Sequence, residues 1–136
     1  DAEAARKRFS FEEIFLIQLD RMRERKFAET EPAFKITKSK KEINNFTSSF
    51  PYPLTIAQER VIVSILADLK RGHPMSRLLE GDVGSGKTAV AAALAYAVVT
   101  TPPTDRKYGS LQVAYMAPTE ILAEQHFQSF IENFGK

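Results

Sequence analysis

Apolar residues recur at helical spacing in several parts of the chain, and this pattern predicts most of its structure. The N-terminal region carries an apolar stripe of Phe11, Ile14, Phe15, Leu19 and Met22. A second stripe consists of Val61, Ile62, Ile65, Leu66 and Leu69. Further along, an Ala-rich run and a Phe-rich run have the same period. The pattern predicts helices over residues 4–27, 55–71, 86–100 and 120–134.

Two short runs have the pattern of strands rather than helices. Residues 77–80 precede the Ala-rich helix, and residues 112–116 follow it after a polar surface loop at 101–109. Short apolar runs of this kind are typical of buried parallel strands. A strand, a helix and a second strand form a β-α-β unit, which implies parallel pairing. We therefore expect an α/β fold, a partial parallel sheet with flanking helices, preceded by an N-terminal helix and a linker.

The segment between the first two helices is poor in apolar residues and rich in turn formers and charge. A basic run at 38–41 could touch a phosphate backbone, although a solvated linker is the default interpretation. One short helical turn is expected near residues 40–46. The predicted organisation is an N-terminal helix at 1–27, a linker at 28–53 and an incomplete motor-like domain at 54–136.

Composition narrows the class of protein only slightly. The 136 residues carry a net charge of +2, which is too small to indicate nucleic acid by itself. The absence of cysteine excludes disulfides and thiolate metal sites. No run approaches the roughly 18 apolar residues that a membrane span needs, and no secretory signal is evident. We expect a cytoplasmic protein without a membrane partner, and a chain that is a piece of a longer product because it begins at Asp1.

The most specific pattern is the run Gly81, Asp82, Val83, Gly84, Ser85, Gly86, Lys87 and Thr88. It matches the phosphate-loop pattern G-x-x-x-x-G-K-[ST] at every fixed position, and it lies between a predicted strand and a predicted helix. The glycines let backbone N–H groups approach phosphate oxygens at a helix N-terminus. The alternative is a Gly-rich turn that happens to end in Lys-Thr, and the complete pattern argues against it.

The loop assigns different tasks to its last residues. Lys87 is a cation that can reach the β- and γ-phosphates of ATP, and the Thr88 hydroxyl is suited to coordinate Mg²⁺.

Two helix starts carry further polar groups. Thr55 and Gln58 have the spacing of a capping box, and Thr119 is the expected N-cap of the last helix.

These motifs together resemble the RecG-type branched-DNA helicases of superfamily 2. Residues 77–88, Arg-Leu-Leu-Glu-Gly-Asp-Val-Gly-Ser-Gly-Lys-Thr, are similar to motif I of that family. Residues 116–126, Met-Ala-Pro-Thr-Glu-Ile-Leu-Ala-Glu-Gln-His, resemble its motif Ia. Residues 50–58 resemble the segment that carries an adenine-reading glutamine, and the match at 9–19 to the lead-in helix is weaker.

The resemblance implies further roles, each with a structural alternative. Gln58 would hydrogen-bond adenine, although its side chain is also suited to cap a helix. Phe50 or Tyr52 would stack near the base, or else pack in the linker. Pro118 and Thr119 would lie against the DNA backbone, or Thr119 would only cap its helix.

The implied function is the ATP-binding portion of an ATP-dependent DNA helicase or translocase that acts on branched DNA in recombination and repair. The implied partners are forked DNA and the remainder of the helicase. The alternative is a P-loop kinase or ATPase with a different substrate. Because no Asp-Glu dipeptide occurs in the sequence, the helicase motif that positions Mg²⁺ and water is missing. We therefore expect this chain alone to bind nucleotide without useful turnover.

Overall fold

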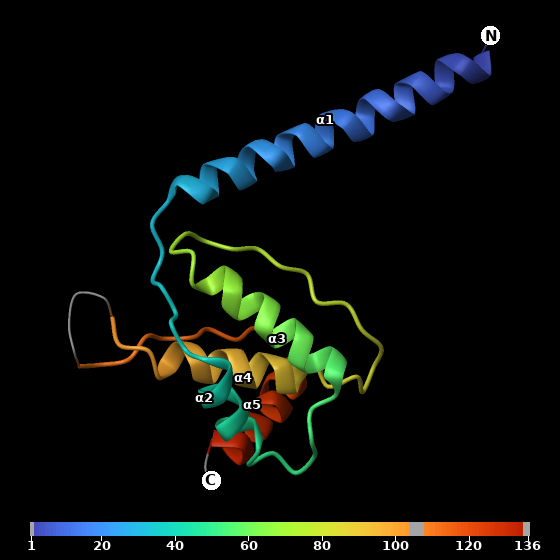
Figure 1. Ribbon diagram of the computed structural model, residues 1–136. Helices are drawn as coiled ribbons and strands as arrows, with labels where there is room; N and C mark the ends of the chain where they lie inside the picture. The colour runs from blue at the N-terminus through green and yellow to red at the C-terminus, as the bar shows by residue number, and fades with distance from the viewer. Residues whose placement is uncertain (1, 104–107, 135–136) are drawn as a thin grey trace.

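The computed structural model describes residues 2–103 and 108–134 (Figure 1). Its helices, in chain order, are α1 (Ala2–Thr30), α2 (Lys40–Thr47), α3 (Ile56–Leu69), α4 (Lys87–Val99) and α5 (Glu120–Phe134). The predicted helices are therefore confirmed in type and order; the last one has the predicted bounds, and the others have shifted ends. The expected helical turn near 40–46 is a complete short helix. The middle of the predicted surface loop at 101–109 lies outside the described residues.

Helix α4 lies at the centre of the core, with α2 and α3 packed against it. Its alanines leave room for this packing, and Ala92, Ala93 and Ala97 are fully buried. The larger core side chains come from the linker, from α2, α3 and α4: Ile36, Ile43, Ile62, Leu66 and Val90. Small side chains let helix backbones approach closely. Helix α4 is therefore in close contact with α2 and with α3.

Capping residues define the starts of α2 and α3. The predicted box at Thr55 and Gln58 is confirmed, and a second one joins Ser39 and Glu42 at the start of α2. The backbone N–H and hydroxyl of Ser39 donate to the Glu42 carboxylate, with Lys38 beside it, and they lower the pKa of Glu42 to about 2. The spacing Ser-x-x-Glu was available in the sequence as a sign of this helix start.

The prediction of an α/β fold with a parallel sheet is wrong for the part of the chain that the structure describes. Residues 2–103 and 108–134 contain helices and irregular chain, with no strand. The segments at 77–80 and 112–116 exchange no backbone hydrogen bond with each other there. Leu78 and Met116 are 83% and 90% exposed instead of buried. An apolar run becomes a strand only when a neighbouring backbone completes its ladder, and these two runs have no such neighbour among the described residues.

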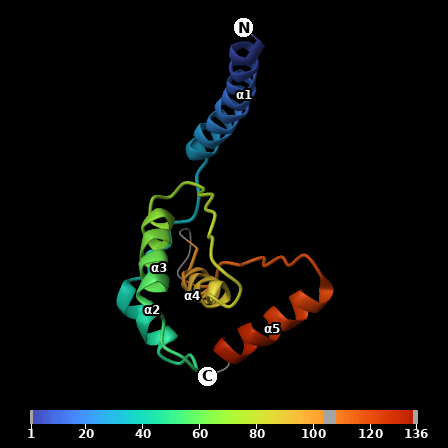
Figure 2. The same ribbon diagram turned by 90° about the vertical axis from the view of Figure 1, so that its right-hand side faces the viewer.

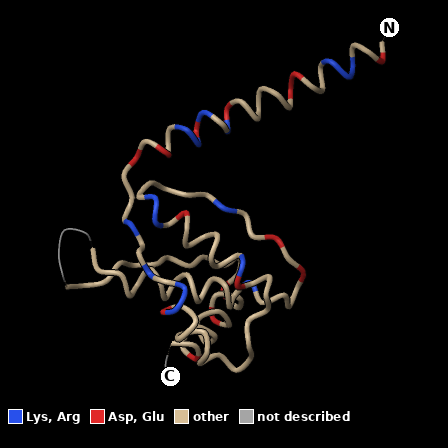
Figure 3. Tube along the Cα trace, in the orientation of Figure 1, with Lys and Arg blue, Asp and Glu red and all other residues tan. Residues whose placement is uncertain are grey.

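Helix α1 projects away from the other helices (Figure 1). The structure buries none of its described residues, and its apolar stripe, including Phe11 and Phe15, faces solvent. Acidic and basic residues are interleaved in groups along it (Figure 3), and several form ion pairs one turn apart. Such exposed pairs contribute little stability. No described helix is long and apolar enough to cross a membrane.

Helix α5 approaches the other helices at its C-terminal end (Figure 2), where aromatic rings join it to the core. Phe46 of α2 stacks on Tyr96 of α4 with ring centroids 4.0 Å apart. The ring centroid of Phe134 lies 5.1 Å from that of Phe46 and 6.2 Å from that of Tyr96. Tyr115, on the segment before α5, lies 5.2 Å from Phe130. Because these contacts are concentrated at its end, α5 reaches the core through its last turns.

We expect Ile43→Ala to lower the free energy of unfolding by about 2–5 kcal/mol, since it leaves a cavity in the core. Ile43 is 1% exposed and joins α2 to the core cluster. Ile56→Ala is the matched control, because Ile56 is 72% exposed at the start of α3. Urea unfolding followed by circular dichroism measures both. Equal losses in the two variants would contradict the packing of α2 described above.

Candidate nucleotide-binding site

The run from Gly81 to Thr88 forms a loop that ends in the first turn of α4. Gly84 and Gly86 have φ angles of +81° and +78°, in the left-handed region that favours glycine. Gly86 is the N-cap of α4, and its carbonyl accepts from the N–H groups of Ala89 and Val90. Gly84 and Gly86 are therefore required by the backbone path of the loop.

Lys87 closes the loop on itself. Its Nζ donates to the carbonyl oxygens of Gly81 and Asp82, each at 2.7 Å, and lies 3.5 Å from Ser85 Oγ. The Ser85 N–H donates to the Asp82 carbonyl at 3.1 Å, which makes a turn inside the loop. The lysine ammonium is therefore held by carbonyls of its own loop, and it would pair with a phosphate only after leaving them.

The loop also contains donors and a hydroxyl that suit phosphate and Mg²⁺. Among the described residues, the N–H groups of Gly84, Gly86, Lys87 and Thr88 have no acceptor. The half-buried Thr88 hydroxyl likewise has no hydrogen-bond partner in the described part of the chain. Unpaired N–H groups at a helix start attract anions, and a hydroxyl next to them is a hard oxygen ligand. These residues fit ATP phosphates and a divalent cation.

Gln58 reaches the loop from α3. Its Nε2 donates to the Ser85 carbonyl at 2.8 Å, while its Oε1 accepts from the Thr55 N–H at 2.7 Å. Of the two predicted roles of Gln58, the capping of α3 is confirmed, and the same side chain also contacts the phosphate loop. Each end of the amide makes one of these bonds, so one N–H and one acceptor lone pair of Gln58 remain for a further partner.

Space around Gly86 is restricted by the same glutamine. A Cβ atom on Gly86 would collide with Gln58 Nε2, whereas a Cβ on Gly84 would meet open space. At Gly81, a Cβ would lie 2.7 Å from Ser85 Oγ. Gly86 is therefore constrained twice, by its φ angle and by the contact with α3.

The aromatic candidates near the base differ in exposure. Phe50 is 7% exposed and packs edge-on against Phe46, with ring centroids 5.3 Å apart. Tyr52 is 49% exposed, and its ring centroid lies 6.4 Å from that of Phe50. Phe50 is thus a core residue here, and of the two only Tyr52 presents a face to solvent.

Pro118 and Thr119 lie at the start of α5, away from the phosphate loop. The Thr119 hydroxyl accepts from the Leu122 N–H at 3.3 Å, and its carbonyl accepts from the Ala123 N–H at 3.0 Å. The predicted N-cap is therefore confirmed. Figure 2 shows the start of α5 separated from α4. The structure does not bring the predicted nucleotide and nucleic-acid residues together into one site.

An ion pair beside the loop was missed by sequence reasoning. Asp68 of α3 is 6% exposed, and Arg77, at the start of the segment that leads into the loop, donates to it through Nε at 2.6 Å and through Nη2. The two residues are nine positions apart and belong to no motif, so neither periodicity nor spacing indicates the contact.

Comparison with known proteins shows the protein family to which this chain belongs. The family profile of DEAD/DEAH box helicases matches residues 55–136, which contain the phosphate loop, Gln58 and Thr119. The chain belongs to the DEAD/DEAH box helicase family. This match argues against the P-loop kinase alternative.

Within that family the chain is similar to RecG proteins. It is 47% identical to ATP-dependent DNA helicase RecG of Bacillus subtilis (strain 168), over 97% of the chain and 18% of the relative. It is 44% identical to the RecG of Aquifex aeolicus (strain VF5), over 93% of the chain and 15% of the relative. A solved structure, RecG bound to a three-way DNA junction, matches with a TM-score of 0.75 and 40% identity, over 98% of this chain and 17% of that one. The chain thus spans less than a fifth of the length of these relatives.

We expect Gly86→Ala to destabilise the chain more than Gly84→Ala. Both changes force alanine into a left-handed backbone at a cost of about 1–2 kcal/mol, but only the first displaces Gln58. The free energies of unfolding, measured in urea, should differ between the two variants. In a Gln58→Ala background the difference should shrink, because the colliding amide is gone. A difference that persists unchanged in that background would contradict the contact.

Proposed function

We propose that this chain is the nucleotide-binding start of the first motor domain of a RecG-like, ATP-dependent DNA helicase or translocase that acts on branched DNA in the cytoplasm. The observation that carries this proposal is the loop from Gly81 to Thr88, with Lys87 at its centre and unpaired N–H groups at the start of α4. The family match and the RecG relatives, which are named as ATP-dependent DNA helicases, support it.

The residues of the loop would divide the work of holding ATP. Lys87 would leave the carbonyls of Gly81 and Asp82 and pair with the β- and γ-phosphates. The N–H groups of Gly84, Gly86 and Thr88 would donate to phosphate oxygens, and the Thr88 hydroxyl would hold Mg²⁺. When bound, Mg²⁺ supplies positive charge that offsets the charge of the phosphates. Gln58 would use its remaining N–H and its remaining lone pair for the adenine edge.

The start of α5 would contact the DNA backbone. The proposed contact uses the hydroxyl of Thr119 and the free N–H groups of the first turn, which suit a phosphate oxygen. Pro118 would fix the direction in which the chain approaches that turn. The matched RecG structure is bound to a three-way DNA junction, and we extend that partner to this chain as part of the proposal. Recombination and repair, in which branched DNA arises, would be the setting.

Lys87→Ala should weaken the binding of Mg-ATP by roughly tenfold or more, because it removes a charge-assisted contact to the phosphates. Titration with a fluorescent ATP analogue measures the affinity. Lys41→Ala is the matched control, because Lys41 is an exposed lysine on α2. Melting curves of both variants separate loss of binding from loss of structure. Unchanged affinity in Lys87→Ala would rule out the proposed phosphate site.

Thr119→Asp should weaken the binding of forked DNA while preserving α5. Aspartate keeps an oxygen that can accept from the Leu122 N–H, so the cap survives. Its charge repels a nearby phosphate by about 1 kcal/mol at 4 Å in water, which corresponds to about a fivefold loss of affinity. Thr119→Ser is the control, since it retains both the cap and the hydroxyl. Fluorescence anisotropy at fixed salt measures binding, and equal affinities for all three proteins would refute the DNA contact.

A further inference from the structure

Helix α3 contacts the phosphate-loop segment at two separate points. Near its N-terminal end, Gln58 donates to the Ser85 carbonyl at 2.8 Å. Near its C-terminal end, Asp68 accepts from Arg77, nine residues along the chain. The segment from Arg77 to Ser85 therefore runs alongside α3 and is attached to it at both of its ends.

Between these attachments the segment has few other contacts. In the described part of the chain, its backbone makes one internal bond, from the Ser85 N–H to the Asp82 carbonyl, besides the bonds accepted from Lys87. Leu78 is largely exposed, and only Leu79 packs against the core cluster. Because residues 77–80 form no strand in the described part of the chain, the side chains of Gln58 and Asp68 are polar attachments that help to place this segment.

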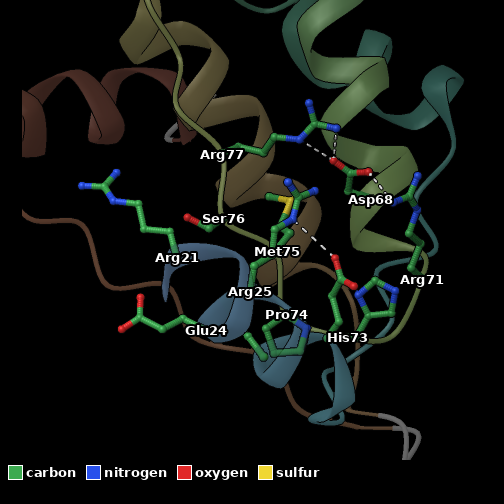
Figure 4. A pocket seen from close by; sticks show the side chains of 12 residues that line it. Arg21, Glu24, Arg25, Asp68, Arg71, His73, Pro74, Met75, Ser76 and Arg77 are labelled. Atoms are coloured by element: carbon green, nitrogen blue, oxygen red, sulfur yellow. Dashed lines mark hydrogen bonds and ion pairs between the residues drawn. The ribbon is translucent and has the colours of Figure 1, made fainter. Parts of the chain in front are cut away.

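The attachment at Asp68 is strong for a physical reason. The carboxylate is almost fully buried, with a side-chain exposure of 7%, and a buried charge without a partner is very unfavourable. Arg71 and Arg77 approach it from opposite sides (Figure 4). Arg71 lies 3.3 Å away, on the turn that ends α3, whereas Arg77 belongs to the segment that leads into the loop.

The two arginines are matched in exposure as well as in partner. Their side chains are 61% and 49% exposed, and both line a cavity of about 590 Å³ between this turn and the end of α1. Removing either guanidinium leaves Asp68 with one partner and opens no hole in the apolar core. Only Arg77, however, connects the carboxylate to the phosphate loop.

We propose that Asp68 and Arg77 are a positioning pair for nucleotide binding: they fix the segment before the phosphate loop on α3, so that the loop amides and Lys87 are held in one place. The pair touches no phosphate itself. This inference rests on the proposed nucleotide-binding role of the loop. It assigns a function in that site to two residues outside the phosphate-loop motif.

The test compares Arg77→Leu with Arg71→Leu in the whole chain. Leucine retains part of the aliphatic stem and removes the charge. Three quantities are measured: hydrogen exchange of the amides from Gly81 to Thr88 without nucleotide, affinity for Mg-ATP, and melting temperature. We expect both variants to lower the melting temperature, Arg77→Leu at least as much as Arg71→Leu, because Arg77 contacts Asp68 through two nitrogens and Arg71 through one. Only Arg77→Leu should speed exchange in the loop and weaken Mg-ATP binding, by roughly tenfold, the effect of one charge-assisted contact.

Two results would overturn the proposal. If Arg71→Leu changes loop exchange and affinity as much as Arg77→Leu, the effect is general stability and not positioning. If Arg77→Leu changes neither quantity, the pair does not hold the loop. Should Arg77→Leu fail to fold, Arg77→Lys and Arg71→Lys are compared instead. Lysine keeps the charge but loses the contact through two nitrogens, so a smaller difference in the same direction is expected, and no difference refutes the pair.

Lys87→Ala, measured beside these variants, keeps the two proposals distinguishable. If Lys87→Ala binds Mg-ATP as well as the unmodified chain does, the proposed nucleotide site fails. Loop exchange in the nucleotide-free proteins then still decides whether Arg77 positions the segment. If Lys87→Ala loses affinity and Arg77→Leu does not, the site stands and the positioning role fails.

Discussion

The packing of α4 against α2 and α3 is the constraint on which the other features depend. Alanines at the contact surface allow the helices to approach closely, and any larger side chain there would force them apart. Since α4 begins at the phosphate loop, this packing also fixes the direction of its first N–H groups. It places α3 close enough for Gln58 to reach Ser85. A hydrophobic contact thus sets the geometry of a polar site.

The sequence predicted the parts of the structure that depend on local interactions. Helix positions follow from periodicity, and the caps at Thr55 and Thr119 follow from side chains that reach backbone three residues away. The phosphate loop could be recognised because its local backbone conformation favours glycine. Gly84 and Gly86 both have positive φ angles. These interactions span few residues, so a short pattern is sufficient to predict them.

The features that could not be predicted join residues far apart in the chain. The predicted strands at 77–80 and 112–116 were wrong because a strand needs a neighbour, which no local pattern supplies. The bond from Gln58 to Ser85 spans 27 positions, and the ion pair of Asp68 with Arg77 spans nine. Phe50 resembled a residue near the base, yet its partners place it in the core. In each case tertiary contacts decided among structures that the local sequence allows.

The bonds of Lys87 to its own loop affect the dissociation constant of any anion that needs the lysine. Any anion that arrives at the loop competes with the carbonyls of Gly81 and Asp82 for the same ammonium group. The observed dissociation constant is therefore the intrinsic one divided by the fraction of molecules in which the lysine has swung free. That fraction is a property of the loop alone, so it weakens by the same factor the binding of every anion that needs the free ammonium group.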